Sequence, residues 1–287
     1  MSAYRFCRTD DIALLVDALN RCWAPHVPGE PLMTPAAFKR SIRDLQVWCS
    51  SCMVAFSGSD PIGVLIGAKR ASATLIQTIA VHPDHLRQGH GRHLLASLGS
   101  KLAILGPPRL VAEVPDTLIP ACELFRVSGY TEEALLTDYV WDAGNRAVPE
   151  GPEGPEDRGG RFVIPVTVDD LVANGLFDQA DAQTCWARSV ETLTARKGDI
   201  AGLAIASDER IEAYVLYAGD EVVSLRCFVD DGGGRLNQLF ASLYARGARK
   251  FVFPKVHPAE ISKDFLEALG FRPDAAYVRY AATARPD

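Results

Sequence analysis

The sequence has no apolar run near the ~20 residues that a membrane-spanning helix needs, so no membrane partner is expected. Its start, Met-Ser-Ala-Tyr-Arg-Phe-Cys, lacks a basic segment followed by an apolar stretch, so no secretory signal is predicted and a cytoplasmic location follows by default.

Basic residues are not in excess: 30 Lys and Arg stand against 36 Asp and Glu, for a net charge of −6, and they form no basic stripe. Nucleic acid is therefore not expected as a partner, and we expect a monomer or a homodimer.

Cysteine is sparse and does not occur in repeated pairs. The seven Cys are an odd number spread over 287 residues, which argues against a disulfide framework. Cys49 and Cys52 form a single Cys-x-x-Cys without a second pair or a nearby His, so we expect buried thiols and not a redox or zinc site. No metal site is predicted.

One segment is poor in apolar residues and divides the chain. From Gly144 to Gly160 the sequence is dense in Pro, Gly and Glu and has no periodicity, which is typical of an exposed linker. The sequence therefore predicts a domain over 1–143, a linker over 144–160 and a second domain over 161–287. The length agrees with about two domains.

The two halves share one order of patterns. Each has two helix-like stretches, three strand-like runs, a helix-like stretch, a strand-like run and a final helix that ends at a Gly followed by an aromatic residue. The matching ends are Gly129-Tyr130 and Gly270-Phe271. This indicates an internal duplication of an α/β domain.

The most informative stretch lies between Ile79 and Leu95. A strand-like run ends at Val81, and an amphipathic helix begins within Gly89-His90-Gly91. Glycine lets backbone N–H groups approach a ligand closely, and a helix N-terminus offers unpaired N–H groups and a positive dipole. With the charges of Arg87 and Arg92, the stretch predicts a cradle for a phosphate or pyrophosphate. A surface turn without a ligand is the alternative.

Four histidines surround this loop, but their number alone does not make a metal site. His82, His85, His90 and His93 are expected to line a solvated turn. Two other phosphate-binding motifs also fail. A P-loop requires Gly-Lys-Ser/Thr where the chain has Gly-Arg-His, and a dinucleotide fingerprint requires a third Gly where Leu94 stands.

Val81-His82-Pro83 followed by Gly89-His90-Gly91 resembles motif A of the GNAT superfamily of acetyltransferases. That motif reads Val-x-Pro, then Arg/Gln-x-x-Gly-x-Gly/Ala. Leu86 stands where the family has Arg or Gln, and Arg87 is expected to supply the charge instead. The stretch Ala121–Tyr130 is similar to the family's Ala-x-x-Leu-Tyr-x-x-x-Gly-Phe, and the order of elements from Arg8 to Tyr139 looks like a whole GNAT domain.

The resemblance implies two tandem GNAT-like domains, each a mixed, mostly antiparallel sheet flanked by helices. It implies an N-acetyltransferase that passes the acetyl group of acetyl-CoA directly to a small amine. The residues that it implies for cofactor binding are Ile79, Ala80, Val81, Arg87, Gln88, Gly89, His90, Gly91, Arg92 and Phe125.

The resemblance leaves the usual acid and base roles unfilled. The family's Tyr in the last helix corresponds to Phe125, and its common Glu on the fourth strand corresponds best to Gln77. Glu113, Asp116 and His26 are the candidate bases. A non-catalytic acyl-CoA-binding module is therefore the alternative function. The acceptor is expected near the end of the strand at 79–81, facing the loop over 24–34.

The second half departs further from the family. Asp230-Asp231-Gly232-Gly233-Gly234 follows its third strand-like run, without Val-x-Pro and without basic residues. Because two carboxylates would repel a pyrophosphate, we expect a degenerate GNAT-like domain and one CoA per chain.

Overall fold

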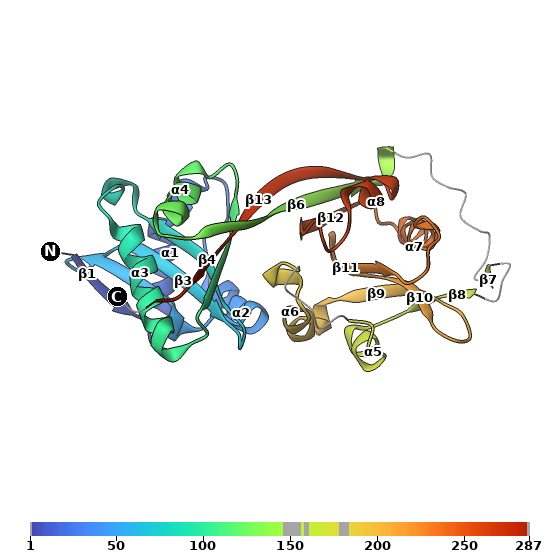
Figure 1. Ribbon diagram of the computed structural model, residues 1–287, viewed down its shortest axis with the longest axis horizontal. Coiled ribbons are helices and arrows are strands. Elements are labelled where there is room, and N and C mark those ends of the chain that lie inside the picture. Colours follow the sequence, from blue (N-terminus) through green and yellow to red (C-terminus); the bar gives the residue numbers. More distant parts are fainter. Residues whose placement is uncertain (1, 146–155, 158–160, 178–183, 286–287) are drawn as a thin grey trace. The chain divides into compact units, whose positions relative to one another are not determined.

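The computed structural model describes residues 2–145, 156–157, 161–177 and 184–285 (Figure 1). The chain forms two compact units: unit 1 is Met1–Ala134 with Val278–Asp287, and unit 2 is Leu135–Tyr277. Most of the predicted linker over 144–160 lies outside the described residues. Among the described helices, none is long and apolar enough to cross a membrane.

These units differ from the predicted division because two strands exchange partners. In the order of strands, β13 (Phe271–Thr283) lies between β5 (Arg109–Pro115) and β6 (Thr131–Asp142), and β6 lies next to β12 (Lys250–Val256). Residues 278–287 therefore complete unit 1, and residues 135–142 belong to unit 2. The backbone N–H of Ala284 donates to Pro108 O at 2.6 Å, which fixes the chain end in unit 1.

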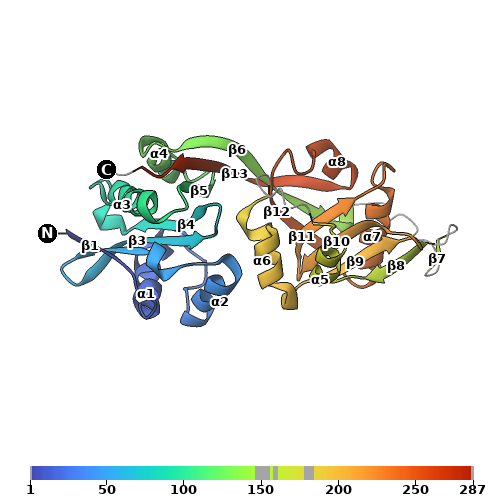
Figure 2. The same cartoon turned by 60° about the horizontal axis from the view of Figure 1, so that its bottom comes forward.

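The sheet of unit 1 has the order β1-β2-β3-β4-β5-β13-β6. Neighbours from β1 to β4 pair antiparallel, whereas β4 and β5 pair parallel. Figure 2 shows α1 and α2 on one face of this sheet and α3 and α4 on the other. The elements not yet bounded are β1 (Ser2–Phe6), α1 (Ile12–Cys22), η1 (Ala24–His26), α2 (Pro35–Leu45), η2 (Cys49–Ser51), β2 (Met53–Ser57), β3 (Asp60–Lys69), β4 (Thr74–Val81), η3 (Pro83–His85), α3 (His90–Leu105) and α4 (Ile119–Val127).

The leucine stripe of α3 forms much of the core of unit 1, as its helical spacing predicts. Leu94, Leu95, Leu98 and Leu102 are all buried against the sheet. Full burial of one such side chain contributes about 1.5–3 kcal/mol. This packing fixes the axis of α3 and therefore the position of its N-terminus.

Unit 2 repeats the arrangement with the order β13-β6-β12-β11-β10-β9-β8-β7. β11 and β12 pair parallel, and the pairs from β11 to β7 are antiparallel. Figure 1 shows α7 and α8 on one face and α5 and α6 on the other. The remaining elements are η4 (Ala143–Asn145), β7 (Glu156–Asp157), β8 (Arg161–Pro165), α5 (Val168–Ala173), η6 (Trp186–Arg188), α6 (Val190–Ala195), η7 (Lys197–Asp199), β9 (Ala201–Ala206), β10 (Ile211–Ala218), β11 (Glu221–Cys227), α7 (Gly234–Ala245) and α8 (Lys263–Ala268). Two mixed, mostly antiparallel α/β units confirm the predicted fold class.

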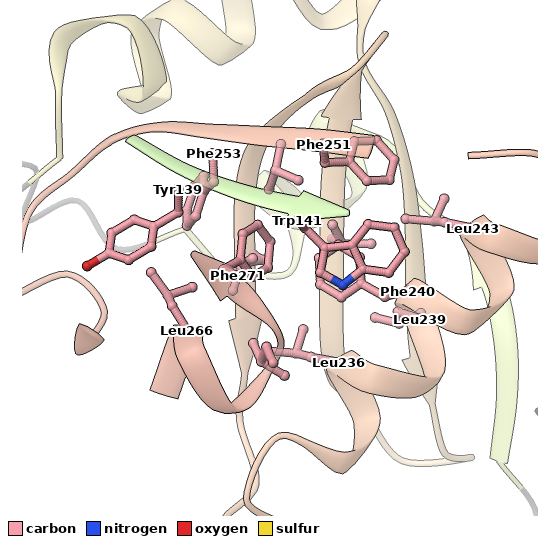
Figure 3. Close-up of a cluster of buried hydrophobic side chains, with 14 of the residues drawn as sticks. Tyr139, Trp141, Leu236, Leu239, Phe240, Leu243, Phe251, Phe253, Leu266 and Phe271 are labelled. Carbon is pink, nitrogen blue, oxygen red and sulfur yellow. The ribbon is translucent and has the colours of Figure 1, made fainter. Parts of the chain in front are cut away.

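An aromatic core holds β6 in unit 2 (Figure 3). Trp141 of β6 stacks on Phe240 of α7 with ring centroids 5.2 Å apart, and its ring lies 6.1 Å from that of Phe251 on β12. Tyr139, two residues earlier on β6, is buried in the same cluster. The alternation of β6 side chains thus places its large aromatics in the core of the second unit.

The two cysteines of the Cys-x-x-Cys are buried thiols, as expected. Cys49 and Cys52 are free and buried, and burial raises the pKa of both thiols. Among the described residues, no three His, Cys, Asp or Glu side chains lie close enough together to hold a metal ion.

Candidate active site

The C-terminal ends of β4 and β5 do not pair with each other, and this unpaired stretch is called the opening below. These parallel strands pair at Thr74 with Leu110 and at Leu75 with Val111, after which the register ends. β4 nevertheless continues to Val81 and β5 to Pro115. The two strands therefore separate toward the end of the sheet where α3 and α4 begin.

The backbone of β4 presents donors to this opening. His82 N donates to Ile62 O on β3 at 2.9 Å, which makes these two residues a hydrogen-bonded pair of the antiparallel ladder. Val81 and Ile79 lie at the alternate, non-hydrogen-bonded positions of the same register. Their N–H and C=O groups consequently point away from β3, toward the side on which β5 diverges.

A β-bulge in β4 precedes these donors. Ile66 on β3 faces Thr78, but Gly67 faces Ile76, so Gln77 is an extra residue on β4. Bulges re-aim side chains and are common beside active sites. Gln77, the predicted counterpart of the family's Glu, is exposed. Gly67, which faces the bulge from β3, allows a close approach of the η2 backbone, because a Cβ there would lie 2.5 Å from Ser51 O.

The loop after β4 ends in an open helix N-terminus. Gly89 is the N-cap of α3 with φ of 88°, a left-handed conformation that glycine adopts without strain. His93 N donates to Gly89 O at 3.0 Å and begins the helical ladder. The N–H groups of His90, Gly91 and Arg92 precede that bond, so they lack i−4 partners and carry the positive end of the dipole. This is the geometry of an anion site.

The two arginines of the loop, Arg87 and Arg92, differ in their contacts. Arg87, at φ of 59°, donates from Nη1 to Glu123 Oε2 of α4 at 3.1 Å, in an exposed ion pair. Arg92 is exposed, and in the described part of the chain no carboxylate lies within ion-pair distance of it. Arg92 is thus accessible to a ligand, whereas Arg87 is held by Glu123.

Gly91 has a packing role that the sequence did not reveal. A Cβ at this position would lie 3.0 Å from Leu124 Cδ2 on α4, whereas a Cβ at Gly89 would meet nothing within 4 Å. Gly91 therefore lets α3 and α4 approach each other. The need for glycine at 89 comes instead from its positive φ.

The expectation of a solvated histidine turn is wrong for His90. Its side chain is buried, and its Nδ1 lies 2.6 Å from the Tyr4 hydroxyl of β1. Burial, with His85 and His93 nearby, lowers the pKa of His90. The ring anchors the first turn of α3 to the sheet, while the backbone N–H stays with the anion site.

Phe125 lies in the core and not at an exposed surface. It is 1% exposed, its ring stacks on Tyr280 of β13 at 5.5 Å, and its ring meets Tyr130 edge-on at 5.1 Å. Phe125, predicted to be the counterpart of the family's Tyr and a cofactor-binding residue, is thus an apolar ring packed between two tyrosines in the core.

The three candidate bases have different surroundings. His26 of η1 is exposed, and its Nε2 lies 2.8 Å from Val81 O, which points toward the opening. Glu113 of β5 forms a buried ion pair with Arg279 of β13 at 3.4 Å. Asp116 is exposed after the end of β5. Of the three, His26 is the one that contacts the end of β4.

In unit 2 the equivalent helix N-terminus is occupied by the chain itself. α7 begins after Gly233, also left-handed, with φ of 86°. The Asp231 carboxylate accepts from Gly233 N at 3.0 Å, from Arg235 N at 2.8 Å and from Arg235 Nη1 at 2.8 Å. Burial raises the pKa of Asp231, but the bonds from Arg235 and Gly233 outweigh it and lower the pKa overall.

The surroundings of the N-termini of α3 and α7 are otherwise alike. β11 and β12 pair at Glu221 with Val252 and then separate, as β4 and β5 do. Counted from the N-cap glycine, Asp231 stands two residues before it, where unit 1 has Arg87. This reversal of charge turns an open anion site into one that is already filled.

Comparison with known proteins agrees with this geometry. No curated protein matches the chain, but the model of the Acetyltransferase (GNAT) family matches residues 14–130. A tandem GNAT protein from the clavulanic acid biosynthesis pathway, solved without AcCoA, is 17% identical, with a TM-score of 0.66 and 100% of both chains covered.

Two further solved structures share the fold over nearly the whole of this chain. A GCN5-related N-acetyltransferase from Sphaerobacter thermophilus is 14% identical with a TM-score of 0.66, covering 99% of this chain and 96% of its own. One from Kribbella flavida is 14% identical with a TM-score of 0.64, covering 99% and 71%. Residues 14–130 therefore match the GNAT acetyltransferase family, and the chain has the fold of tandem GNAT proteins.

Proposed function

We propose that unit 1 is an acetyl-CoA-dependent N-acetyltransferase that acts on a small-molecule amine by direct transfer from the thioester. The observation that carries this is the opening between β4 and β5 beside the unfilled N-terminus of α3. The pyrophosphate binds at the loop over 87–92, and the pantetheine arm enters between the strands. The N–H groups of Ile79 and Val81 then face the thioester oxygen, where negative charge develops in the transition state.

His26 is the proposed base. In a neutral imidazole, donation from Nε2 to Val81 O leaves the lone pair on Nδ1, which accepts a proton from the incoming ammonium or amine. The neutral nitrogen attacks the thioester carbonyl carbon, and the C–S bond breaks. The nitrogen then loses its remaining excess proton, which passes through water to the departing sulfur because Phe125 has no proton to give.

The acceptor is proposed to bind between the end of β4 and the loop over 24–34. An attacking nitrogen must come within roughly 3–3.5 Å of the carbonyl carbon, so it must be held by segments at the opening. The contact of His26 with Val81 places η1 there. A structure with a bisubstrate analogue tests this, and acceptor contacts made solely by residues after 160 would refute it.

A non-catalytic acyl-CoA-binding module is the second candidate, and the buried apolar ring of Phe125 favours it. Free-thiol release from acetyl-CoA against a panel of amines separates the two functions, with calorimetry of CoA binding in parallel. Amine-dependent release that is lost in His26→Gln, with CoA affinity retained, supports the enzyme. Binding without release over the whole panel supports the module.

A further inference from the structure

A buried arginine lies at the stretch of unit 2 that matches the opening of unit 1. β11 and β12 pair at Glu221 with Val252, and residues 253–256 lie in the part of β12 that has separated from β11. Arg188 of η6 reaches this part of β12, and its side chain is only 1% exposed. A buried charge is costly unless it is well paired, so the bonds of Arg188 explain why it lies there.

The guanidinium of Arg188 binds both the strand and a carboxylate. Its Nε donates to Pro254 O at 2.7 Å, and its Nη2 donates to Lys255 O at 3.2 Å. Nη1 and Nη2 also donate to the two carboxylate oxygens of Glu260, both at 2.7 Å, in a bidentate pair. The guanidinium carbon lies 4.4 Å from the centroid of the Phe253 ring. Arg188 is therefore held firmly at the separated end of β12.

The two carbonyls that Arg188 binds belong to a bulge in β12. Pro254 and Lys255 both stand opposite the single residue Asp138 of β6, whose Oδ1 accepts from Lys255 N at 2.7 Å. A bulge interrupts the ladder between two strands and leaves backbone groups unpaired. Arg188 thus takes up the hydrogen-bonding capacity of β12 at the place where a ligand would otherwise meet it.

The space that remains beside Arg188 is small. A hollow of about 40 Å³ has a lining that includes Arg188 and Glu260 together with residues 223–226 of β11. Small-molecule sites typically measure ~300–1,000 Å³. Because the hollow borders both Arg188 and β11, the guanidinium lies between the two separated strands. Among the described residues, it leaves too little room there for the arm of a ligand.

The corresponding loop of unit 1 leaves the strand end accessible. η6 stands between the helices α5 and α6 of unit 2, as η1 stands between α1 and α2 of unit 1. The last residue of η1 is His26, which is exposed and lies 2.8 Å from Val81 O. The last residue of η6 is Arg188. Matching loops thus carry the proposed base in unit 1 and a buried cation in unit 2.

We propose that Arg188 is an internal plug, whose guanidinium takes the place between β11 and β12 that the pantetheine arm takes between β4 and β5. The proposal rests on the proposed function, because that function places the arm in unit 1. Asp231 then fills the phosphate end of the second site, and Arg188 fills the arm end. Two separate groups of the chain close unit 2 to acyl-CoA, so removal of either one alone leaves it closed.

The test is calorimetric titration of the full chain with CoA. In Arg188→Ala/Glu260→Ala, both partners of the buried pair are removed together, so neither charge is left unpaired. With Asp231→Ala added, we expect saturation at two CoA per chain, whereas Asp231→Ala alone saturates at one. Lys197→Ala/Asp169→Ala with Asp231→Ala is the matched control, because that ion pair of unit 2 is exposed, and it should also saturate at one.

Saturation at one in the triple variant, with both units shown to be folded by urea unfolding, would overturn the proposal. Where unit 2 has unfolded, Arg188→Ala alone decides, with S-acetylpantetheine as an arm that carries no phosphate. This arm should raise the Tm of Arg188→Ala more than that of the unmodified chain. Methylguanidinium, which refills the plug, should abolish the difference. Equal shifts in the absence of methylguanidinium would overturn the proposal.

Failure of the proposed function would give a different result. The unmodified chain would then bind no CoA and release no thiol. The plug is measured instead by the increase in bound CoA from the unmodified chain to the triple variant, which is one per chain whether or not unit 1 binds CoA.

Discussion

Replacing Asp231 by Ala should destabilise unit 2, because this carboxylate fills the N-terminus of α7. It accepts two backbone N–H bonds and one bond from the Arg235 guanidinium, and its side chain is 19% exposed. Loss of a capping side chain costs about 0.5–2 kcal/mol, and loss of a hydrogen bond to a charged group about 1.5–3 kcal/mol. Arg235 keeps Glu212 as a partner at 2.6 Å, so we expect a total of about 2–3 kcal/mol.

Thermal and urea unfolding at pH 7 measure this loss. For a unit of this size, about 2–3 kcal/mol corresponds to a drop in Tm of roughly 4–12 °C. Asp230→Ala is the matched control, since Asp230 is the preceding residue and is exposed. Equal stability of Asp231→Ala and the unmodified chain, or an equal loss in Asp230→Ala, would refute the capping argument.

The pH dependence follows from the lowered pKa of Asp231. A carboxylate whose pKa is lower in the folded state stabilises the fold fully above its unfolded pKa of about 3.9, and the contribution disappears as pH falls through the folded value. The difference between the unmodified chain and Asp231→Ala should therefore be constant from pH 5 to 8 and shrink below about pH 4. Sulfate should restore stability to Asp231→Ala more than to the unmodified chain, by occupying the freed N–H groups.

Three further outcomes concern CoA and turnover. Calorimetric titration with CoA should saturate at one per chain because Asp231 blocks the second anion site, and saturation at two would contradict this. His26→Gln should lower kcat by about 10²–10⁴-fold, the usual contribution of a general base, in a steady-state thiol assay; unchanged kcat would rule out this base. Phe125→Tyr should leave CoA affinity unchanged and raise turnover or leave it as it is, and a large loss with an intact fold would show that the apolar ring itself is required.

Patterns among neighbouring residues predicted the helix α3 and the loop before it, because both depend on interactions that are local in sequence. The stripe from Leu94 to Leu102 has helical spacing, and the helix buries it as expected. Gly89 stands where the chain needs a left-handed N-cap, so the loop and the helix start were readable from the sequence. The charge of the Asp230-Asp231 loop also indicated a site closed to phosphate, although not that Asp231 itself is the ligand.

The pairing of strands that are distant in sequence could not be predicted in the same way. β6 and β13 have ordinary strand patterns, and nothing within a strand specifies which neighbour it will pair with. The exchange therefore appeared only in the structure, and with it the Arg279 that pairs with Glu113. The roles of His90 and Gly91 were missed for a similar reason, since their partners Tyr4 and Leu124 are distant in sequence.

The strand exchange itself can be tested at Tyr280, which is completely buried and stacks on Phe125. Tyr280→Ala leaves a cavity beside α4, and such a loss of a large aromatic ring costs about 3–5 kcal/mol. Tyr280→Phe keeps the ring and loses one hydrogen bond to Glu132 at 3.3 Å, for a loss of about 1 kcal/mol. Because Leu124, the residue before Phe125, packs against Gly91, Tyr280→Ala should also weaken CoA binding, whereas Tyr280→Phe should not. If urea unfolding showed the two variants to be equally stable, the C-terminal strand would not belong to the core of unit 1.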